Sequence, residues 1–199
     1  SAGDVNGDGI DDLIIGAKFA DPNADNSGAG ESYVVFGKSG GFSSTVELSS
    51  LDGNNGFTLN GVDEDDYSGF SVSSAGDVNG DGLDDIIIGA RNASPPPNQP
   101  RSGESYVVFG KSDGFSPTLE LSSLDGNNGF SLPGIVGDNW SGNSVSSAGD
   151  ANGDGLDDII IGAPNGNGFF GQSYVVFGRP ANEAPNDPDE PTSGSSFET

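Results

Sequence analysis

A long internal repeat is the feature that most constrains the fold of this chain. The segments SAGDVNGDGIDDLIIGA, SAGDVNGDGLDDIIIGA and SAGDANGDGLDDIIIGA, spaced by 73 residues, begin at Ser1, Ser74 and Ser147. The block ESYVVFG, with Gln in place of Glu in its last copy, begins at Glu31, Glu104 and Gln172. A third block, LSSLDGNNGF, begins at Leu48 and Leu121. Long periods are typical of supersecondary units that bury little alone and stack to build a shared core.

The residues of each repeat favour strands and turns. The chain has 34 glycines and is only 32% apolar, and no window places apolar residues at helical spacing over three turns. Glycine inside a helix costs about 1 kcal/mol relative to alanine. One period reads as four strands: GFSVSSAG from Gly69, DIIIGA from Asp85, SYVVFG from Ser105 and GFSLPG from Gly129. We therefore expect an all-β protein with about four short strands per repeat.

Four strands per repeat, separated by turn signals, are typical of the antiparallel blade of a β-propeller. A β-solenoid is the alternative fold for a repeat of this kind. Solenoid coils are usually shorter and keep a rigid rung spacing, whereas these repeats vary in the stretch between the second and third strands. The sequence therefore favours propeller blades.

The repeats do not make up a closed ring. The sequence starts where a first strand should end and the repeats stop after a third strand, giving about two and a half blades: 1–73, 74–146 and the partial 147–178. Propellers have about 4 to 8 blades, so these blades are expected to stay open unless more sequence or other copies complete them. Residues 179–199 are rich in Pro and acid and are predicted to form a linker.

Charge and composition exclude several kinds of partner and chemistry. The chain carries 31 acidic and 6 basic residues, a formal charge of -25, which repels nucleic acid and anionic membrane surfaces. No apolar run reaches the roughly 20 residues of a membrane span. With no Cys and no His, the chain lacks disulfides, soft metal ligands and the usual nucleophile and base pairs. Cations bound by oxygen ligands are the natural partners, and we expect no enzyme activity.

Each repeat contains a nine-residue loop with the spacing of a metal site. Counting Asp4 as position 1, oxygen-bearing side chains fall at positions 1, 3, 5 and 9, and Gly9 at position 6 permits a sharp turn. Position 7 is expected to offer its backbone carbonyl. The predicted ligands are Asp4, Asn6, Asp8, Ile10 and Asp12; Asp77, Asn79, Asp81, Leu83 and Asp85; and Asp150, Asn152, Asp154, Leu156 and Asp158.

The donor set predicts three structural Ca²⁺ sites. A shell of carboxylates, an amide and a carbonyl, with room for water, favours Ca²⁺ over the strictly octahedral Mg²⁺. Without a cation the carboxylates would repel one another, which argues against a merely solvated acidic turn. EF-hand and dockerin modules need an acidic ligand at position 12, where this chain has Ile15, Ile88 and Ile161. The acids at position 8 are expected to face solvent or a backbone amide; they are Asp11, Asp84 and Asp157.

Together the nine-residue loop, the IIIGA or LIIGA strand and the YVVFG strand resemble the FG-GAP repeat over residues 1–178. This repeat is the blade unit of the integrin α-subunit propeller and of related bacterial surface proteins. The family's Gly-Ala-Pro is complete only at Gly162 to Pro164, because Lys18 and Arg91 replace the proline elsewhere. The family's Phe-Gly before the loop strand is Ser-Gly here, at Ser68 and Ser141. The LSSLDGNNGF insert looks most like that of bacterial members of the family, which tend to occur in large secreted or surface-attached proteins.

The resemblance implies two functional faces. The calcium loops would lie on one face, and the connections between the second and third strands and between blades would lie on the other, where integrin-like propellers bind ligands. That second face would carry the aromatic residues Phe19, Tyr67, Trp140, Phe169 and Phe170 and the acidic run 63–66. Exposed aromatic residues in loops can bind a protein or a glycan, or they can simply pack the rim of the blade.

The expected function is that of a calcium-binding, extracellular or cell-surface propeller module, part of a secreted protein, for adhesion or protein–protein assembly. One alternative is a repeat subunit of an extracellular filament or surface layer, in which open blade edges mediate self-association. Another is a non-catalytic module of a secreted hydrolase. Neither nucleic acid binding nor membrane insertion is expected.

Overall fold

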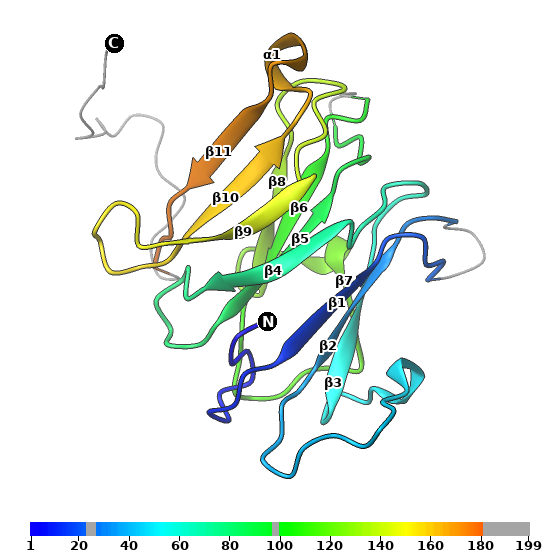
Figure 1. Ribbon diagram of the computed structural model, residues 1–199, viewed down its shortest axis with the longest axis vertical. Coiled ribbons are helices and arrows are strands. Elements are labelled where there is room, and N and C mark those ends of the chain that lie inside the picture. Colours follow the sequence, from blue (N-terminus) through cyan, green and yellow to red (C-terminus); the bar gives the residue numbers. More distant parts are fainter. Residues whose placement is uncertain (23–26, 97–99, 181–199) are drawn as a thin grey trace.

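The computed structural model describes residues 1–22, 27–96 and 100–180 and consists mostly of short strands and turns (Figure 1). The strands are β1 Leu13–Ala17, β2 Glu31–Val35, β3 Gly56–Asn60, β4 Ser71–Gly76, β5 Asp85–Ala90, β6 Glu104–Val108, β7 Thr118–Glu120, β8 Gly129–Pro133, β9 Ser144–Gly149, β10 Asp158–Ala163 and β11 Gln172–Val176. Within these residues the helical elements are α1, Gly166–Phe169, and the 3₁₀ turns η1, Leu48–Ser50, and η2, Leu121–Ser123. The all-β prediction is confirmed. No helix of the described residues has the length and apolar character needed to cross a membrane.

The strands form three sheets, which we call the first, middle and third blades. The middle blade has the order β4-β5-β6-β8 with antiparallel neighbours and contains all four strands expected of a propeller blade. The first blade, β1-β2-β3-β7, has no strand beside β1 on its open side, and the third blade, β11-β10-β9, ends at β11. The prediction of about two and a half open blades is therefore confirmed. Residues 181–199 of the predicted linker lie outside the described residues.

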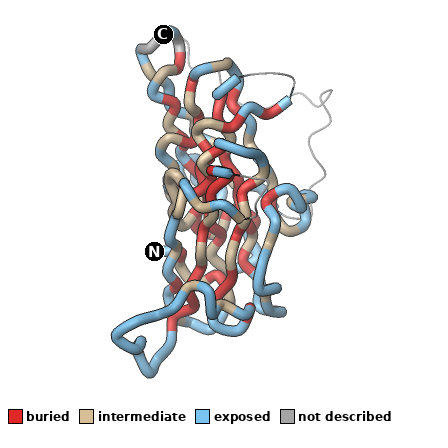
Figure 2. Tube along the Cα trace, turned by 90° about the vertical axis from the view of Figure 1, so that its right-hand side faces the viewer, coloured by how far each residue is buried: buried red, intermediate tan, exposed pale blue. Residues whose placement is uncertain are grey.

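The blades stack face to face, so alternate side chains of one strand enter different cores (Figure 1). Ile86 and Ile88 of β5 lie in a core shared with Val34 of the first blade. Ile87, between them, lies in a second core shared with Ile159 of the third blade. Side chains in a strand point alternately to opposite faces, so β5, covered on both sides, is buried along its whole length. Figure 2 shows buried segments through the middle of the molecule and exposed residues mainly at the loops.

One strand leaves its own repeat and joins the neighbouring blade. β7 lies in the repeat that builds the middle blade, yet it pairs in parallel with β3 of the first blade, Leu119 opposite Leu59. Phe115, just before β7, stacks on Phe57 with ring centroids 4.1 Å apart and an interplanar angle of 4°. The sequence predicted four antiparallel strands per repeat and gave no sign of this exchange, because β7 is only three residues long.

Candidate metal centre

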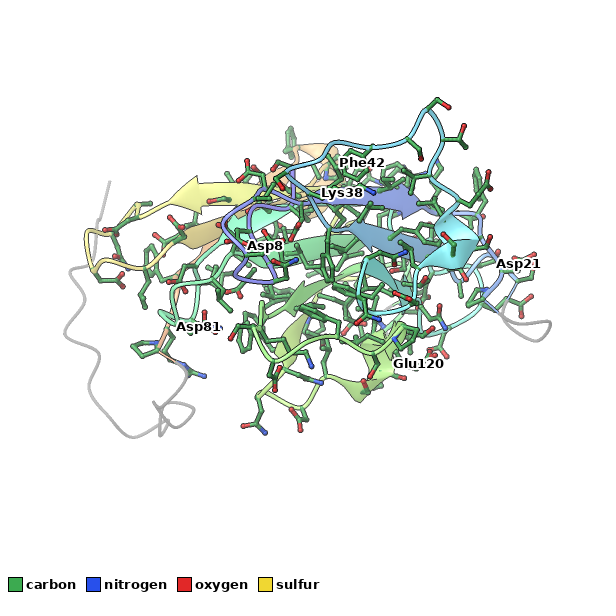
Figure 3. The ribbon with its side chains drawn as sticks, turned by 90° about the horizontal axis from the view of Figure 1, so that it is seen from below. Asp8, Asp21, Lys38, Phe42, Asp81 and Glu120 are labelled. Atoms are coloured by element: carbon green, nitrogen blue, oxygen red, sulfur yellow. The ribbon has the colours of Figure 1, made fainter. Side chains whose placement is uncertain are left out.

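The acidic loops join the first and second strands of the blades, as the sequence predicted. Residues 77–84 connect β4 to β5, residues 150–157 connect β9 to β10, and residues 4–11 precede β1. Figure 3 shows Asp8 and Asp81 toward one end of the strands and Asp21, in a connection between second and third strands, at the opposite end. The predicted metal loops and the predicted ligand face therefore occupy opposite ends of the blades.

The Asp at position 1 organises each turn through its carboxylate. In the first loop the Oδ1 of Asp4 accepts hydrogen bonds from the N–H groups of Gly7 and Asp8, at 2.8 and 3.0 Å. Its Oδ2 accepts one from the N–H of Gly9 at 2.8 Å. Gly7 and Gly9 have φ values of 76° and 84°, left-handed conformations that glycine adopts readily. The other two loops repeat the same bonds, so the loop fold is a property of the motif.

The side chains at positions 3 and 5 also accept backbone N–H groups of the same loop, and the carbonyl at position 7 lies farther along it. The Oδ1 of Asn6 accepts the N–H of Asp8, and the Oδ1 of Asp8 accepts the N–H of Ile10, both at 2.9 Å. The Nδ2 of Asn6 donates to the Oδ2 of Asp8 at 3.4 Å. At position 7, no backbone N–H of the described residues donates to the carbonyl of Ile10. This carbonyl therefore has lone pairs available for an ion.

The Asp at position 9 is buried and ties its loop to a different strand of the blade. Asp85 has no exposed surface; its Oδ2 accepts the N–H of Val78 at 3.0 Å and its Oδ1 accepts that of Gly110 at 2.9 Å. Gly110 lies just beyond β6, so one carboxylate links the first turn of the blade to the end of the third strand. Asp12 and Asp158 are equally buried and make the corresponding bonds.

Burial makes the ionised form of Asp85 and Asp12 costly. It raises the pKa of Asp85 to about 7 and that of Asp12 to about 6. Two backbone N–H bonds oppose each rise, while the charges at positions 1 and 5 add to it. The ion pairs of the described residues, Arg101–Asp138 and Lys111–Asp113, lie outside the loops. A bound cation would supply the positive charge that the buried carboxylates lack.

The loops fit Ca²⁺ in donor type, although they do not form a finished cage. Among the described residues, no three acidic side chains lie close enough together to hold an ion, because their oxygens are turned toward backbone N–H groups. A carboxylate oxygen that accepts one N–H keeps another lone pair for a cation. Asp8 is exposed, so its side chain can turn toward an ion without disturbing the core. Three carboxylates, one amide and one carbonyl are the oxygen ligands that Ca²⁺ prefers.

The Asp at position 8 connects the loops of successive blades. The Oδ2 of Asp84 accepts the N–H of Asp4 at 2.8 Å, and the Oδ2 of Asp157 accepts that of Asp77 at 3.0 Å. The sequence predicted that these acids face solvent or a backbone amide. It did not reveal that the amide belongs to the preceding repeat, because the partners lie 80 residues apart with no pattern linking them. Asp11, in the first repeat, is exposed.

The opposite end of the blades carries the predicted aromatic residues in two different environments. Phe19 and Phe170 are exposed, whereas Tyr67 and Trp140 are partly buried. The side chain of Phe169 lies outside the described residues. Within the acidic run 63–66, burial raises the pKa of Asp66 to about 7. Only some of the predicted residues are therefore available to a ligand.

Two basic residues, Lys18 and Arg91, stand where the family has proline and also lie at this end of the blades. The guanidinium carbon of Arg91 lies 3.8 Å from the ring centroid of Phe70 and 5.3 Å from that of Trp140. The Nζ of Lys18 lies 4.4 Å from the centroid of the same Phe70 ring. Cations over aromatic faces are attracted by the ring quadrupole. The sequence identified both substitutions but did not predict these contacts.

Comparison with known proteins assigns the repeats. The FG-GAP repeat family matches residues 1–35, 68–108 and 141–176, more than half of the chain. The chain belongs to the FG-GAP repeat family. Each matched FG-GAP segment contains an acidic loop, the strand after it and most of a YVVFG block. The residues between the matches, 36–67 and 109–140, contain β3, β7 and β8.

These FG-GAP repeats are also similar to integrin α subunits. Integrin alpha pat-2 of Caenorhabditis elegans is 32% identical over 176 residues, covering 80% of this chain and 12% of the relative. Integrin alpha-5 of Xenopus laevis is 32% identical over 185 residues, covering 90% of this chain and 15% of the relative. Integrin alpha-PS5 of Drosophila melanogaster is 28% identical over 173 residues, covering 85% of this chain and 15% of the relative. The chain therefore spans a small part of the length of these relatives.

Proposed function

We propose that these FG-GAP repeats are calcium-binding blades of an extracellular or cell-surface protein and serve adhesion or protein–protein assembly. The observation that carries the proposal is the buried Asp at position 9, whose charge has no basic partner among the described residues and whose oxygens join a loop to the third strand. Similarity to integrin α subunits supports an extracellular setting and a role in adhesion. The absence of Cys and His from the sequence argues against an enzyme.

In this proposal each loop holds one Ca²⁺ through five residues. Positions 1, 3 and 5 would bind it through side-chain oxygens, position 7 through its carbonyl and position 9 through the buried carboxylate, with the residues given above for the three loops. The ion would neutralise charge that burial makes costly and would hold the turn between first and second strands against the third strand. The role of Ca²⁺ is therefore structural.

The partner of the module, a protein or a glycan, would bind at the end opposite the loops. Phe19 and Phe170 offer exposed aromatic surface there, and Arg91 lies against the rings of Phe70 and Trp140. Aromatic residues and arginine are enriched at the centres of binding interfaces. The connections that carry these residues differ most between the repeats, which suits a surface selected for one partner.

Calcium binding can be tested by titration calorimetry of the chain after treatment with a chelator. We expect three sites per chain with dissociation constants of roughly 10⁻⁴ to 10⁻³ M, as is common for extracellular modules. Asp81→Ala removes an exposed ligand from the middle loop and should reduce the number of sites to two. Asp113→Ala, an exposed acid outside the loops, is the matched control and should leave three. Absence of Ca²⁺ binding, or an Asp81→Ala chain that still binds three ions, contradicts the proposal.

A further inference from the structure

The acidic loops of successive repeats contact one another through the same pair of hydrogen bonds. Between the first and middle loops, the N–H of Asp4 donates to the Oδ2 of Asp84 at 2.8 Å, and the N–H of Asp84 donates to the carbonyl of Asp4 at 3.2 Å. Asp77 and Asp157 repeat both bonds between the middle and third loops, at 3.0 Å each. The position-8 acid of one loop therefore binds both backbone polar groups of the position-1 residue in the loop before it.

Packing and a further backbone bond strengthen the same contact. A Cβ added to Gly7, in the first loop, would lie 3.0 Å from the Cδ2 of Leu83, so this side chain of the middle loop packs directly on the glycine. The N–H of Lys111, which follows β6, donates to the carbonyl of Val5 at 2.9 Å. The middle and third loops repeat both contacts, with Gly80 against Leu156 and Val78 bound by the N–H of Arg179.

The residues in contact are those that would hold the ions. Asp4 is the position-1 ligand proposed for the first loop. Asp84, which binds it, stands in the chain between two ligands proposed for the middle loop, the carbonyl of Leu83 and the carboxylate of Asp85. When both neighbours of Asp84 are held by an ion, Asp84 is held as well. Its two hydrogen bonds then restrict the backbone of Asp4.

Each loop has to change shape before it can hold an ion. Among the described residues, no three acidic side chains lie close enough together to bind a metal. In the first loop the Asp4 carboxylate is bound to three N–H groups of its own turn. Movement of Asp4 toward an ion therefore moves the turn and the backbone that Asp84 contacts. Ordering one loop removes part of the entropic cost of ordering the loop beside it.

We propose, on the basis of the function proposed above, that the three loops bind Ca²⁺ cooperatively, each occupied loop raising the affinity of the loop that it contacts. The middle loop contacts both of the others, whereas the first and third loops share no hydrogen bond among the described residues. The coupling therefore runs through the middle loop. Repulsion between bound ions acts in the opposite sense, but salt and the Asp84 carboxylate between the loops screen it.

A Ca²⁺ titration followed by NMR measures the three loops separately. The amide N–H of the position-6 glycine reports on each loop; these residues are Gly9, Gly82 and Gly155. Asp8→Ala removes an exposed ligand from the first loop and should abolish binding there. The Ca²⁺ concentration that half-saturates the middle loop should then rise at least about fivefold, and that of the third loop should change less. Asp113→Ala, outside the loops, is the control and should change neither.

A second set of variants tests the link itself. Asp84→Ala removes the carboxylate between the loops but keeps every proposed ligand, so adding Asp8→Ala to it should change half-saturation of the middle loop by less than about twofold. Asp84→Asn keeps an acceptor oxygen and should retain the fivefold effect. Asp11→Ala is the matched control, because this position-8 acid is exposed and accepts no hydrogen bond from another loop of the described residues. It should retain the effect too.

The outcomes separate loss of coupling from loss of Ca²⁺ binding, and dispersed amide signals in the same spectra verify that each variant is folded. If Asp8→Ala leaves half-saturation of the middle loop unchanged, or lowers it, cooperativity is overturned while the Ca²⁺ sites stand. An undiminished effect in the Asp84→Ala chain overturns the assigned link. If none of the three glycines responds to Ca²⁺, the proposed function fails, and cooperativity fails with it.

Discussion

At the scale of single residues, the loops depend on carboxylates that bind backbone N–H groups. Asp85 joins its own loop to the end of β6, while Asp84, next to it, joins the middle blade to the first. Adjacent side chains thus hold two different interfaces, one within a blade and one between blades. The repeated Gly-Asp-Gly and Asp-Asp motifs predicted the loop itself, because the conformation of a turn is determined by residues close in sequence. The contact of Asp84 with Asp4 depends on how the blades stack, which local spacing does not encode.

Glycine before the loop provides a sharp test of this link between blades. A Cβ at Gly76 would lie 2.1 Å from the Oδ2 of Asp157, whereas a Cβ at Gly149, in the same position of the third repeat, would meet nothing within 4 Å. Both have positive φ, 75° and 64°, so the backbone strain of alanine is similar. We expect Gly76→Ala to lower the free energy of unfolding by about 2 kcal/mol more than Gly149→Ala in the monomeric chain. Urea unfolding measures both, and equal losses would contradict the contact.

At the scale of elements, the strand exchange of β7 ties the first and middle blades together. The fold of the other strands followed from the period and from runs such as Asp-Ile-Ile-Ile-Gly-Ala, whose apolar residues fill both faces of a buried strand. β7 was missed because Thr118–Glu120 is short and its partner, β3, lies 60 residues earlier in the chain. β7 lies outside the matched FG-GAP segments, between residues 108 and 141.

The stacked ring before β7 tests the contribution of this exchange. Phe115→Ala removes the ring that lies 4.1 Å from Phe57, and we expect a loss of about 2 kcal/mol in the free energy of unfolding, since Phe115 is partly buried. Phe42→Ala, at the same position of the first repeat, removes an exposed ring and should cost less than about 0.5 kcal/mol in the monomer. Urea unfolding of the two variants is the measurement. A Phe115→Ala chain as stable as Phe42→Ala would show that β7 adds little.

At the scale of the whole molecule, three stacked blades place acidic loops at one end and variable connections at the other (Figures 1 and 3). In the proposed function, the end with the acidic loops holds cations that stabilise the blades, and the opposite end binds the partner. The sequence predicted the loops and their likeness to FG-GAP repeats. It did not predict that Phe19 is exposed while Trp140 is half-buried, because burial at that end depends on how connections from neighbouring blades pack.

Unfolding with and without Ca²⁺ tests the central claim, that the ion stabilises the blades, most directly. We expect urea unfolding of the chain in excess Ca²⁺ to require more denaturant than in EDTA, with a gain of about 1 to 3 kcal/mol for each occupied site, and Mg²⁺ to have a much smaller effect. Transitions that coincide in Ca²⁺ and EDTA would contradict a structural role for the ion in these loops.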